Sequence, residues 1–118
     1  MKKVGILGGG QLGLMLYQAS LSYPSRFFFL DADSNCPCSQ VASNFTYGDF
    51  KHYETVLEFG STKDVISIEI EDVNIKALKK LKKIGKKVIP DPEVLEMIQN
   101  KRQNLGKFND IFTIFLDS

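Results

Sequence analysis

Three glycines near the start of the chain have a spacing that suits a phosphate-binding turn. Gly8, Gly10 and Gly13 follow the apolar run 4–7 and match the pattern G-x-G-x-x-G. Small residues at these positions permit a tight turn, close approach of a ligand to the backbone, and close contact between a strand and the next helix. The turn would direct free N–H groups at the start of the helix toward an anion. The motif therefore indicates a phosphorylated or nucleotide ligand.

One interpretation of this turn is a dinucleotide-binding site. Asp31 follows the apolar run 26–30 and lies close to the distance, about 20 residues, at which such sites place an acidic residue for the ribose hydroxyls. This interpretation predicts the NAD(P)-binding domain of an oxidoreductase. Many nucleotide folds begin with the same turn without binding a dinucleotide, so the motif alone leaves the ligand class open.

The other residue types that can do chemistry point to no second site. Cys36 and Cys38 are too close in sequence for a relaxed disulfide, and two thiols without a nearby histidine do not supply the four ligands of structural zinc. We therefore expect reduced thiols. His52 is the single histidine and has no Ser, Cys or carboxylate at a recognisable catalytic spacing, so we expect it at the surface near a helix start.

Composition excludes several classes of partner. The chain has 15 Lys and Arg against 14 Asp and Glu, so a net charge of +1 gives no reason to expect nucleic acid or an anionic membrane surface. The lysine-rich segment 76–87 is interpreted as a solvated helix face, because no aromatic residues are interleaved with it for stacking. The apolar runs are too short to cross a bilayer, and the N-terminus lacks a secretory signal. We expect a soluble, cytoplasmic protein of one domain.

The elements that must position the glycine turn alternate between strand-like and helix-like patterns, as in a βαβ protein. Strands are predicted at 4–7, 26–30, 45–46, 65–70 and 88–89, and helices at 11–21, 39–42, 50–59, 75–84 and from 92 to 98. The continuous apolar run at 26–30 is typical of a strand that is buried on both faces of a parallel sheet. The pattern predicts an α/β fold, a Rossmann-like parallel sheet with helices on both faces.

Local signals set the expected faces and ends of the helices. In the first helix, a 3, 4 and 7 spacing predicts a buried face made of Leu12, Met15, Leu16 and Ala19. The next long helix is expected to begin at an Asp49 cap and to end at Gly60. Gly85 is expected to end the lysine-rich helix, and Pro92 fits the first turn of the last helix.

Four segments, in order along the chain, resemble one enzyme family. They are GGGQLGLML at 8–16, the segment 33–42 with PCSQVA, IEIEDVN at 68–74, and IPDP at 89–92 together with IQNKR at 98–102. They are similar to the 5-(carboxyamino)imidazole ribonucleotide synthase family of ATP-grasp enzymes, also called the ATPase subunit of phosphoribosylaminoimidazole carboxylase. The resemblance implies a pre-ATP-grasp domain at 1–102. From 103 to 118 the family pattern is lost in an apolar tail, which suggests a truncated or frame-shifted product without the ATP-grasp domain.

The resemblance implies a role in purine biosynthesis. The family couples ATP cleavage to carboxylation of 5-aminoimidazole ribonucleotide with bicarbonate, through a carboxyphosphate intermediate. Its full-length members use ATP and magnesium, and the metal-binding carboxylates lie outside the part that this chain resembles. We therefore expect no catalytic residue, no metal site and no tightly bound cofactor in this chain, and no activity when it is alone.

The resemblance also assigns roles to particular residues. The backbone of the glycine turn and the Gln11 amide would meet one end of the ribonucleotide. Glu69 would face its sugar or aminoimidazole as an acceptor, and Glu71 would lie behind Glu69. The expected substrate-binding residues are Gly10, Gln11, Leu12, Glu69 and Glu71, and Lys101 is expected to contact an ATP phosphate. Strand alternation would put the two carboxylates on one face, at the sheet edge where the glycine turn lies.

Two expectations concern what the chain does besides catalysis. A third function class, a non-catalytic fold remnant that binds nothing tightly, stays open beside the ligase and the oxidoreductase. The apolar segment 108–116 is expected to drive self-association into a homo-oligomer, because burying such side chains is worth roughly 1.5–3 kcal/mol each.

Overall fold

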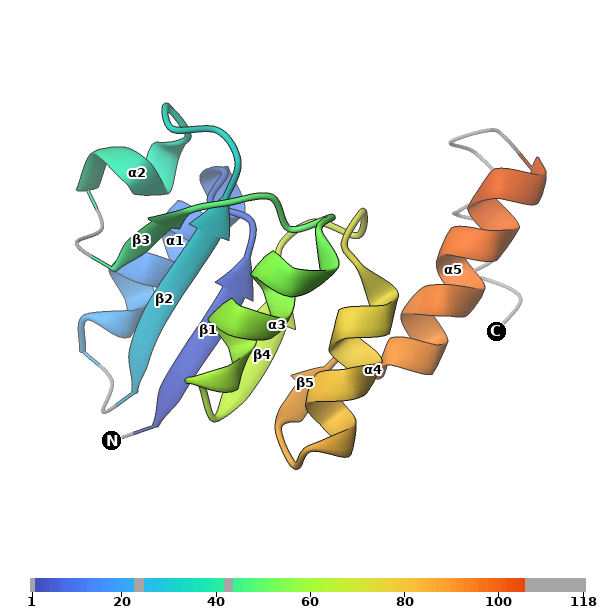
Figure 1. The fold of residues 1–118 in the computed structure, drawn as a ribbon. Helices are drawn as coiled ribbons and strands as arrows, with labels where there is room; N and C mark the ends of the chain where they lie inside the picture. Colours follow the sequence, from blue (N-terminus) through green and yellow to red (C-terminus); the bar gives the residue numbers. More distant parts are fainter. Residues whose placement is uncertain (1, 23–24, 42–43, 106–118) are drawn as a thin grey trace.

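The computed structural model describes residues 2–22, 25–41 and 44–105, with side chains up to Lys101. The strands are β1 (Lys3–Leu7), β2 (Arg26–Asp31), β3 (Phe45–Tyr47), β4 (Val65–Ile68) and β5 (Lys87–Ile89). They form one parallel sheet in the order β3-β2-β1-β4-β5 (Figure 1). The helices are α1 (Gln11–Ser20), α2 (Pro37–Val41), α3 (Tyr53–Ser61), α4 (Ile75–Lys83) and α5 (Pro92–Leu105). The predicted tail at 108–116 lies outside the described residues.

Alternating side chains of the central strands build a core on each face of the sheet. Ile6 and Phe29 point to one face, where α1 and α2 pack on them. Leu7 and Leu30 point to the other, where the buried residues of α3 and α4 and Leu95 of α5 gather. Successive residues of a strand face opposite sides, so strands covered on both faces must be apolar throughout. The predicted fold class, with helices on both faces, is confirmed.

Of the predicted buried face of α1, Leu16 packs against the sheet, but Leu12, Met15 and Ala19 are exposed. Leu12 is 52% exposed and Met15 is 63% exposed, whereas Gly13 is buried and Leu14, Leu16 and Tyr17 pack against the sheet. A Cβ at Gly13 would stand 3.0 Å from the carbonyl oxygen of Gly8, so the helix can approach the turn only on a glycine side. This close approach rotates α1 away from the face that its apolar spacing favours.

Both predicted ends of α3 are also displaced. His52, not Asp49, is the N-cap, and its Nδ1 accepts a hydrogen bond from the Thr55 N–H. Its exposed position near a helix start is as expected. Gly60 lies within the helix. A Cβ there would come within 2.5 Å of Leu81 Cδ1 on α4, which explains why this helical position is a glycine. That glycine therefore serves close packing of α3 on α4 and does not end the helix.

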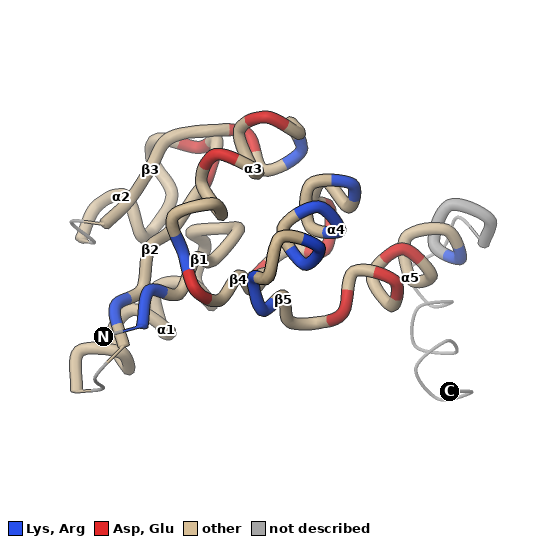
Figure 2. The backbone as a smooth tube through the Cα atoms, turned by 60° about the horizontal axis from the view of Figure 1, so that its bottom comes forward, with Lys and Arg blue, Asp and Glu red and all other residues tan. Residues whose placement is uncertain are grey.

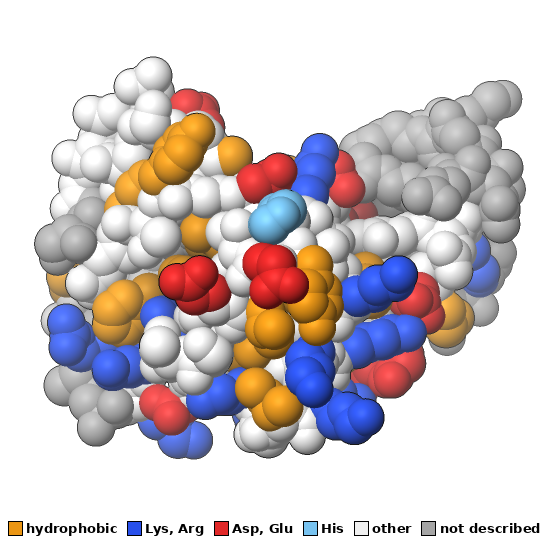
Figure 3. Space-filling view, in the orientation of Figure 1, with side chains coloured by type: hydrophobic (Ala, Val, Ile, Leu, Met, Phe, Trp, Pro, Cys, Tyr) orange, Lys and Arg blue, Asp and Glu red, His pale blue; other side chains and the backbone are white. Residues whose placement is uncertain are grey.

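Charged side chains join α4 to α5 at the end of the molecule opposite β3. Lys79 pairs with Glu96 at 2.9 Å, and Lys82 pairs with Asp91 at 2.8 Å and with Glu93 at 3.3 Å. Figure 2 shows basic positions along α4 and acidic positions along α5, and Figure 3 shows basic side chains gathered on the surface over α4. The lysine-rich segment is thus a solvated helix face, as predicted, and part of it holds α5. Gly85, with a φ of +101°, follows α4 as expected.

Candidate functional site

The order in which strands are added to the sheet reverses at β1: β2 and β3 extend the sheet on one side of it, and β4 and β5 extend it on the other. Ligands of open α/β sheets bind at such a point, outside the carboxyl ends of the strands. Three loops leave the sheet there: the glycine turn after β1, the segment that begins with Asp31 at the end of β2, and the segment that begins with Glu69 after β4. The motifs singled out in the sequence therefore meet at one edge.

The glycine turn can be built only from glycine where it faces β4. Gly8 has a φ of +113°, a conformation that L side chains rarely adopt, and a Cβ there would lie 2.8 Å from Glu69 Oε2. Its N–H donates to the Leu30 carbonyl at 2.8 Å, which ties the turn to β2. Gly8 is thus required by both its backbone conformation and the carboxylate beside it.

Glu69 is bonded directly to the glycine turn. Its Oε2 accepts the Gly10 N–H at 2.7 Å, and its own N–H donates to the Leu7 carbonyl at 2.9 Å. The side chain is half-buried, and its Oε1 accepts no hydrogen bond from the part of the chain that the structure describes. The two predicted residues Gly10 and Glu69 are therefore brought together, and the turn fixes one of the carboxylate oxygens.

The start of α1 lies beside that carboxylate. Gly10 is the N-cap and has no side chain to cap the first turn, so the N–H groups of Gln11 and Leu12 begin the helix without an internal partner. Both side chains are exposed. The positive end of the helix dipole thus lies beside the Glu69 carboxylate, and the helix start is the part of this edge that attracts negative charge.

Asp31 binds the glycine turn through its carboxylate. Its Oδ2 accepts the Gly9 N–H at 2.8 Å, and its Oδ1 accepts the Asp33 N–H at 2.9 Å. Both oxygens are therefore engaged by the protein's own backbone. The carboxylate on which the oxidoreductase interpretation depends therefore holds the glycine turn. The sequence predicted that this carboxylate lies at the carboxyl end of β2, but it could not show that the carboxylate binds the Gly9 N–H.

Two thiols pack behind the turn. Cys36 and Cys38 are buried and free, and the Cys38 N–H donates to the Gly9 carbonyl at 2.9 Å. Burial raises the pKa of Cys38 to about 11, and the nearby Cys36, Glu69 and Asp31 add to the increase. Such a thiol stays protonated at neutral pH, which disfavours a nucleophilic role. Both cysteines pack in the interior of the protein, and no feature of the sequence predicted this burial.

Glu71 and Lys101 are placed differently from Glu69. Strand β4 ends at Ile68, so Glu71 lies in a loop, and the alternation argument that paired it with Glu69 does not apply. Its carbonyl accepts the Val73 N–H at 2.9 Å and Gln99 Nε2 at 2.7 Å. Lys101 is exposed on α5. Its contact with an ATP phosphate stays a prediction, as does any role for the Glu71 side chain.

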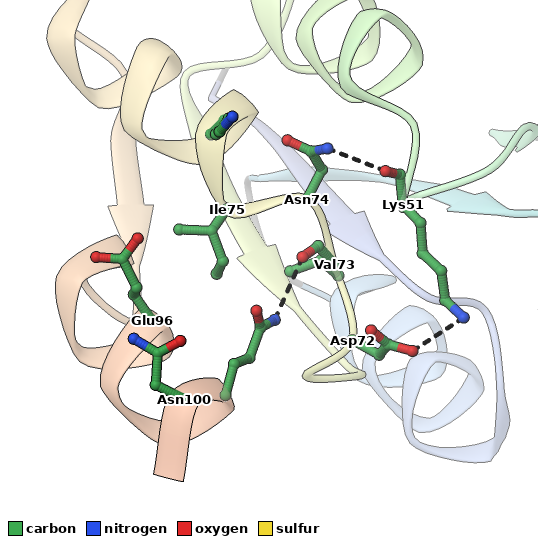
Figure 4. A pocket seen from close by; sticks show the side chains of 9 residues that line it. Lys51, Asp72, Val73, Asn74, Ile75, Glu96 and Asn100 are labelled. Carbon is green, nitrogen blue, oxygen red and sulfur yellow. Dashed lines mark hydrogen bonds and ion pairs between the residues drawn. The ribbon is translucent and has the colours of Figure 1, made fainter. Parts of the chain in front are cut away.

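A hollow of about 440 Å³ opens between α5 and the loop that follows β4 (Figure 4). Several of its polar side chains bind other groups of the protein: Lys51 pairs with Asp72 at 2.9 Å, and Asn74 donates to the Lys51 carbonyl at 3.0 Å and accepts from the Ala77 N–H. The side chains that line the hollow therefore help to hold the loop that follows β4. Across the described ranges, no three His, Cys, Asp or Glu side chains are grouped as a metal site would need, and no helix is long and apolar enough to span a bilayer.

Comparison with known families identifies the family of this chain. The family model described as the ribonucleotide synthetase preATP-grasp domain matches residues 1–99. The chain belongs to this family. The preATP-grasp match covers all the elements that form the glycine-turn edge, and it confirms the resemblance found in the sequence.

Named relatives agree with the preATP-grasp assignment. The phosphoribosylaminoimidazole carboxylase of Vigna aconitifolia chloroplasts is 38% identical over 100 residues, which are 85% of this chain and 18% of that protein. The N5-carboxyaminoimidazole ribonucleotide synthetase structure from Thermotoga maritima has a TM-score of 0.78 and 36% identity, covering 86% of this chain and 28% of that one. The Aspergillus clavatus synthase bound to ADP and 5-aminoimidazole ribonucleotide has a TM-score of 0.75 and 36% identity, covering 91% and 29%. This chain thus spans less than a third of each.

Proposed function

We propose that this chain is the ribonucleotide-binding part of an ATP-dependent ligase that carboxylates 5-aminoimidazole ribonucleotide with bicarbonate in purine biosynthesis. The observation that carries the proposal is the hydrogen bond between Glu69 and Gly10, at the sheet edge where α1 begins. A similar synthase from Aspergillus clavatus was solved with that ribonucleotide and ADP, which supports the choice of ligand.

Glu69 would recognise the sugar or the amine of the ribonucleotide. Because the Gly10 N–H holds Oε2, the carboxylate keeps one orientation and offers Oε1 to the ligand. A carboxylate accepts hydrogen bonds from hydroxyl or amino groups, and these bonds are stronger than those between neutral groups. The fixed orientation lowers the entropy that the side chain would lose on binding.

The phosphate of the ribonucleotide would lie at the start of α1. The N–H groups of Gln11 and Leu12 and the Gln11 amide supply donors, and the helix dipole favours the negative charge. The Glu69 carboxylate already binds the Gly10 N–H, so the phosphate would bind on the Gln11 side of the turn, away from that charge. The sugar end of the ligand would then face Glu69.

The reaction also needs groups from outside this chain's described residues. Phosphoryl transfer from ATP to bicarbonate gives carboxyphosphate, whose carboxyl carbon the ribonucleotide amine attacks as phosphate leaves. The exposed Lys101 would contribute a cation to an ATP phosphate. ATP, with magnesium, supplies the phosphoryl group. Because charge neutralisation by metal ions and further cations is required, we expect this polypeptide alone to show no bicarbonate-dependent ATP hydrolysis.

Calorimetric titration of the full chain with 5-aminoimidazole ribonucleotide tests the proposal. Glu69→Gln should weaken binding about 10- to 100-fold, because a charge-assisted hydrogen bond is lost. Glu58→Gln removes an exposed carboxylate from α3 and should leave the affinity unchanged. Tighter binding of a nicotinamide dinucleotide than of the ribonucleotide would contradict the proposal, and so would equal affinities for wild type and Glu69→Gln.

A further inference from the structure

The three glycines of the motif make room for a side chain of the protein itself. A Cβ at Gly8 would lie 2.8 Å from Glu69 Oε2, and a Cβ at Gly10 would lie 3.1 Å from Oε1 of the same carboxylate. A Cβ at Gly13 would lie 3.6 Å from Oε2. At Gly9, which is outside the motif spacing, the nearest atoms belong to other residues. The motif glycines therefore surround one carboxylate, in a space that we call the glycine cradle.

The backbone N–H groups of the turn already have acceptors within the chain. The Gly8 N–H donates to a backbone carbonyl of β2, and the Gly9 N–H donates to Asp31 Oδ2. The Gly10 N–H donates to Glu69 Oε2 at 2.7 Å. In a dinucleotide-binding turn, the second glycine of the motif lets the backbone approach a pyrophosphate. Here the second glycine is Gly10, and the group that lies against it is a carboxylate.

The negative charge of these carboxylates is not balanced by a nearby cation. Neither Asp31 nor Glu69 forms an ion pair in the part of the chain that the structure describes. Residues 8–25, which include the whole of α1, contain no Lys or Arg. The positive end of the α1 dipole already lies beside Glu69. A phosphate that entered the cradle would therefore meet a like charge in a part-buried position, where water and salt screen it less than at the surface.

We infer that Glu69 is a specificity-determining residue, whose carboxylate occupies the glycine cradle and keeps the phosphate and diphosphate groups of a ligand out of it. The cradle then receives ligand groups that donate hydrogen bonds, such as ribose hydroxyls or an amine. The phosphate of a ribonucleotide is thereby kept on the Gln11 side of the turn. This orientation of the ribonucleotide rests on the proposed function, whereas the exclusion of anions from the cradle can be tested without that ligand.

Titration of the full chain with inorganic pyrophosphate, followed by amide chemical shifts at constant ionic strength, tests the exclusion. Glu69→Ala frees the Gly10 N–H and removes the charge. Pyrophosphate should therefore shift the Gly10 resonance and bind about tenfold more tightly than to wild type. Glu69→Gln should gain less, because its amide oxygen can still accept the Gly10 N–H. Glu58→Ala removes an exposed carboxylate from α3, and this matched control should gain nothing.

Tighter pyrophosphate binding at Gly10 in Glu69→Ala, with unchanged hydrogen exchange at the buried Ile66 amide of β4, supports the inference. Equal affinities for wild type and Glu69→Ala, or an equal gain in Glu58→Ala, would overturn it. If Glu69→Ala disturbs the Ile66 amide, the same comparison is made with Glu69→Gln, which keeps the length of the side chain. A gain of pyrophosphate binding in a chain whose wild type does not bind 5-aminoimidazole ribonucleotide would refute the proposed function and leave the exclusion supported.

Discussion

The glycine turn and the surface between α4 and α5 use charged residues in contrasting ways. At the glycine turn, Asp31 and Glu69 each accept a backbone N–H in a part-buried position, and the distances are 2.8 and 2.7 Å. Between α4 and α5, lysines and carboxylates pair on an exposed surface. Hydrogen bonds shielded from water fix geometry, whereas exposed ion pairs mainly keep the surface solvated. The two regions therefore differ in what their charges bind: backbone N–H groups at the glycine turn, and other charged side chains between α4 and α5.

Gly8→Ala should have the largest effect on the turn. The substitution combines a positive φ with a Cβ only 2.8 Å from Glu69 Oε2, so we expect the unfolding free energy to fall by about 2–4 kcal/mol. Gly85→Ala is a matched control: its φ is +101°, but a Cβ there has nothing within 4 Å. Urea unfolding of both variants measures the difference. Equal losses would show that the contact with Glu69 contributes nothing.

Asp31→Asn should have the next largest effect. The amide keeps one acceptor oxygen and turns its NH2 group toward a backbone N–H, at a cost of about 1–3 kcal/mol. Asp33→Asn is the control, because Asp33 accepts one exposed N–H, from Asn35. If thermal unfolding shows no greater loss for Asp31→Asn, the carboxylate does not hold the turn.

Cys38 should produce a pH dependence of stability. Its pKa rises from 9.0 to about 11 in the fold because burial disfavours the thiolate. The unfolded chain therefore loses this proton first, and the unfolding free energy should decline as pH rises from 9 toward 11. Unfolding curves measured across that window should show a smaller decline for Cys38→Ala. Parallel curves for the two proteins would exclude a buried neutral thiol.

Lys82→Met should have the smallest effect. Lys82 binds Asp91 and Glu93 at the surface, and these hydrogen bonds raise the pKa of its ammonium group. Because the groups are exposed, we expect a smaller change in melting temperature than for Asp31→Asn, and one that disappears in high salt. A fall in melting temperature as large as that of Asp31→Asn, and one that persists in high salt, would remove the contrast between the glycine turn and the surface between α4 and α5.

Sequence patterns predicted the order of the elements, the parallel sheet and the edge at which the glycine turn lies, because apolar runs and glycine spacing act locally. They failed where tertiary contacts decide. The face of α1 is set by the approach of Gly13 to Gly8, and the role of Gly60 by Leu81. The bonds from Asp31 to Gly9 and from Glu69 to Gly10 join residues far apart in the chain, so no local pattern could predict them.

Amide chemical shifts during a titration with 5-aminoimidazole ribonucleotide test the central claim most directly. We predict that the largest changes occur at Gly10, Gln11 and Leu12, that they saturate, and that Glu69→Gln reduces them while Glu58→Gln does not. Changes confined to other segments, or changes at the turn that Glu69→Gln leaves intact, would contradict a ribonucleotide site built from the glycine turn and this carboxylate.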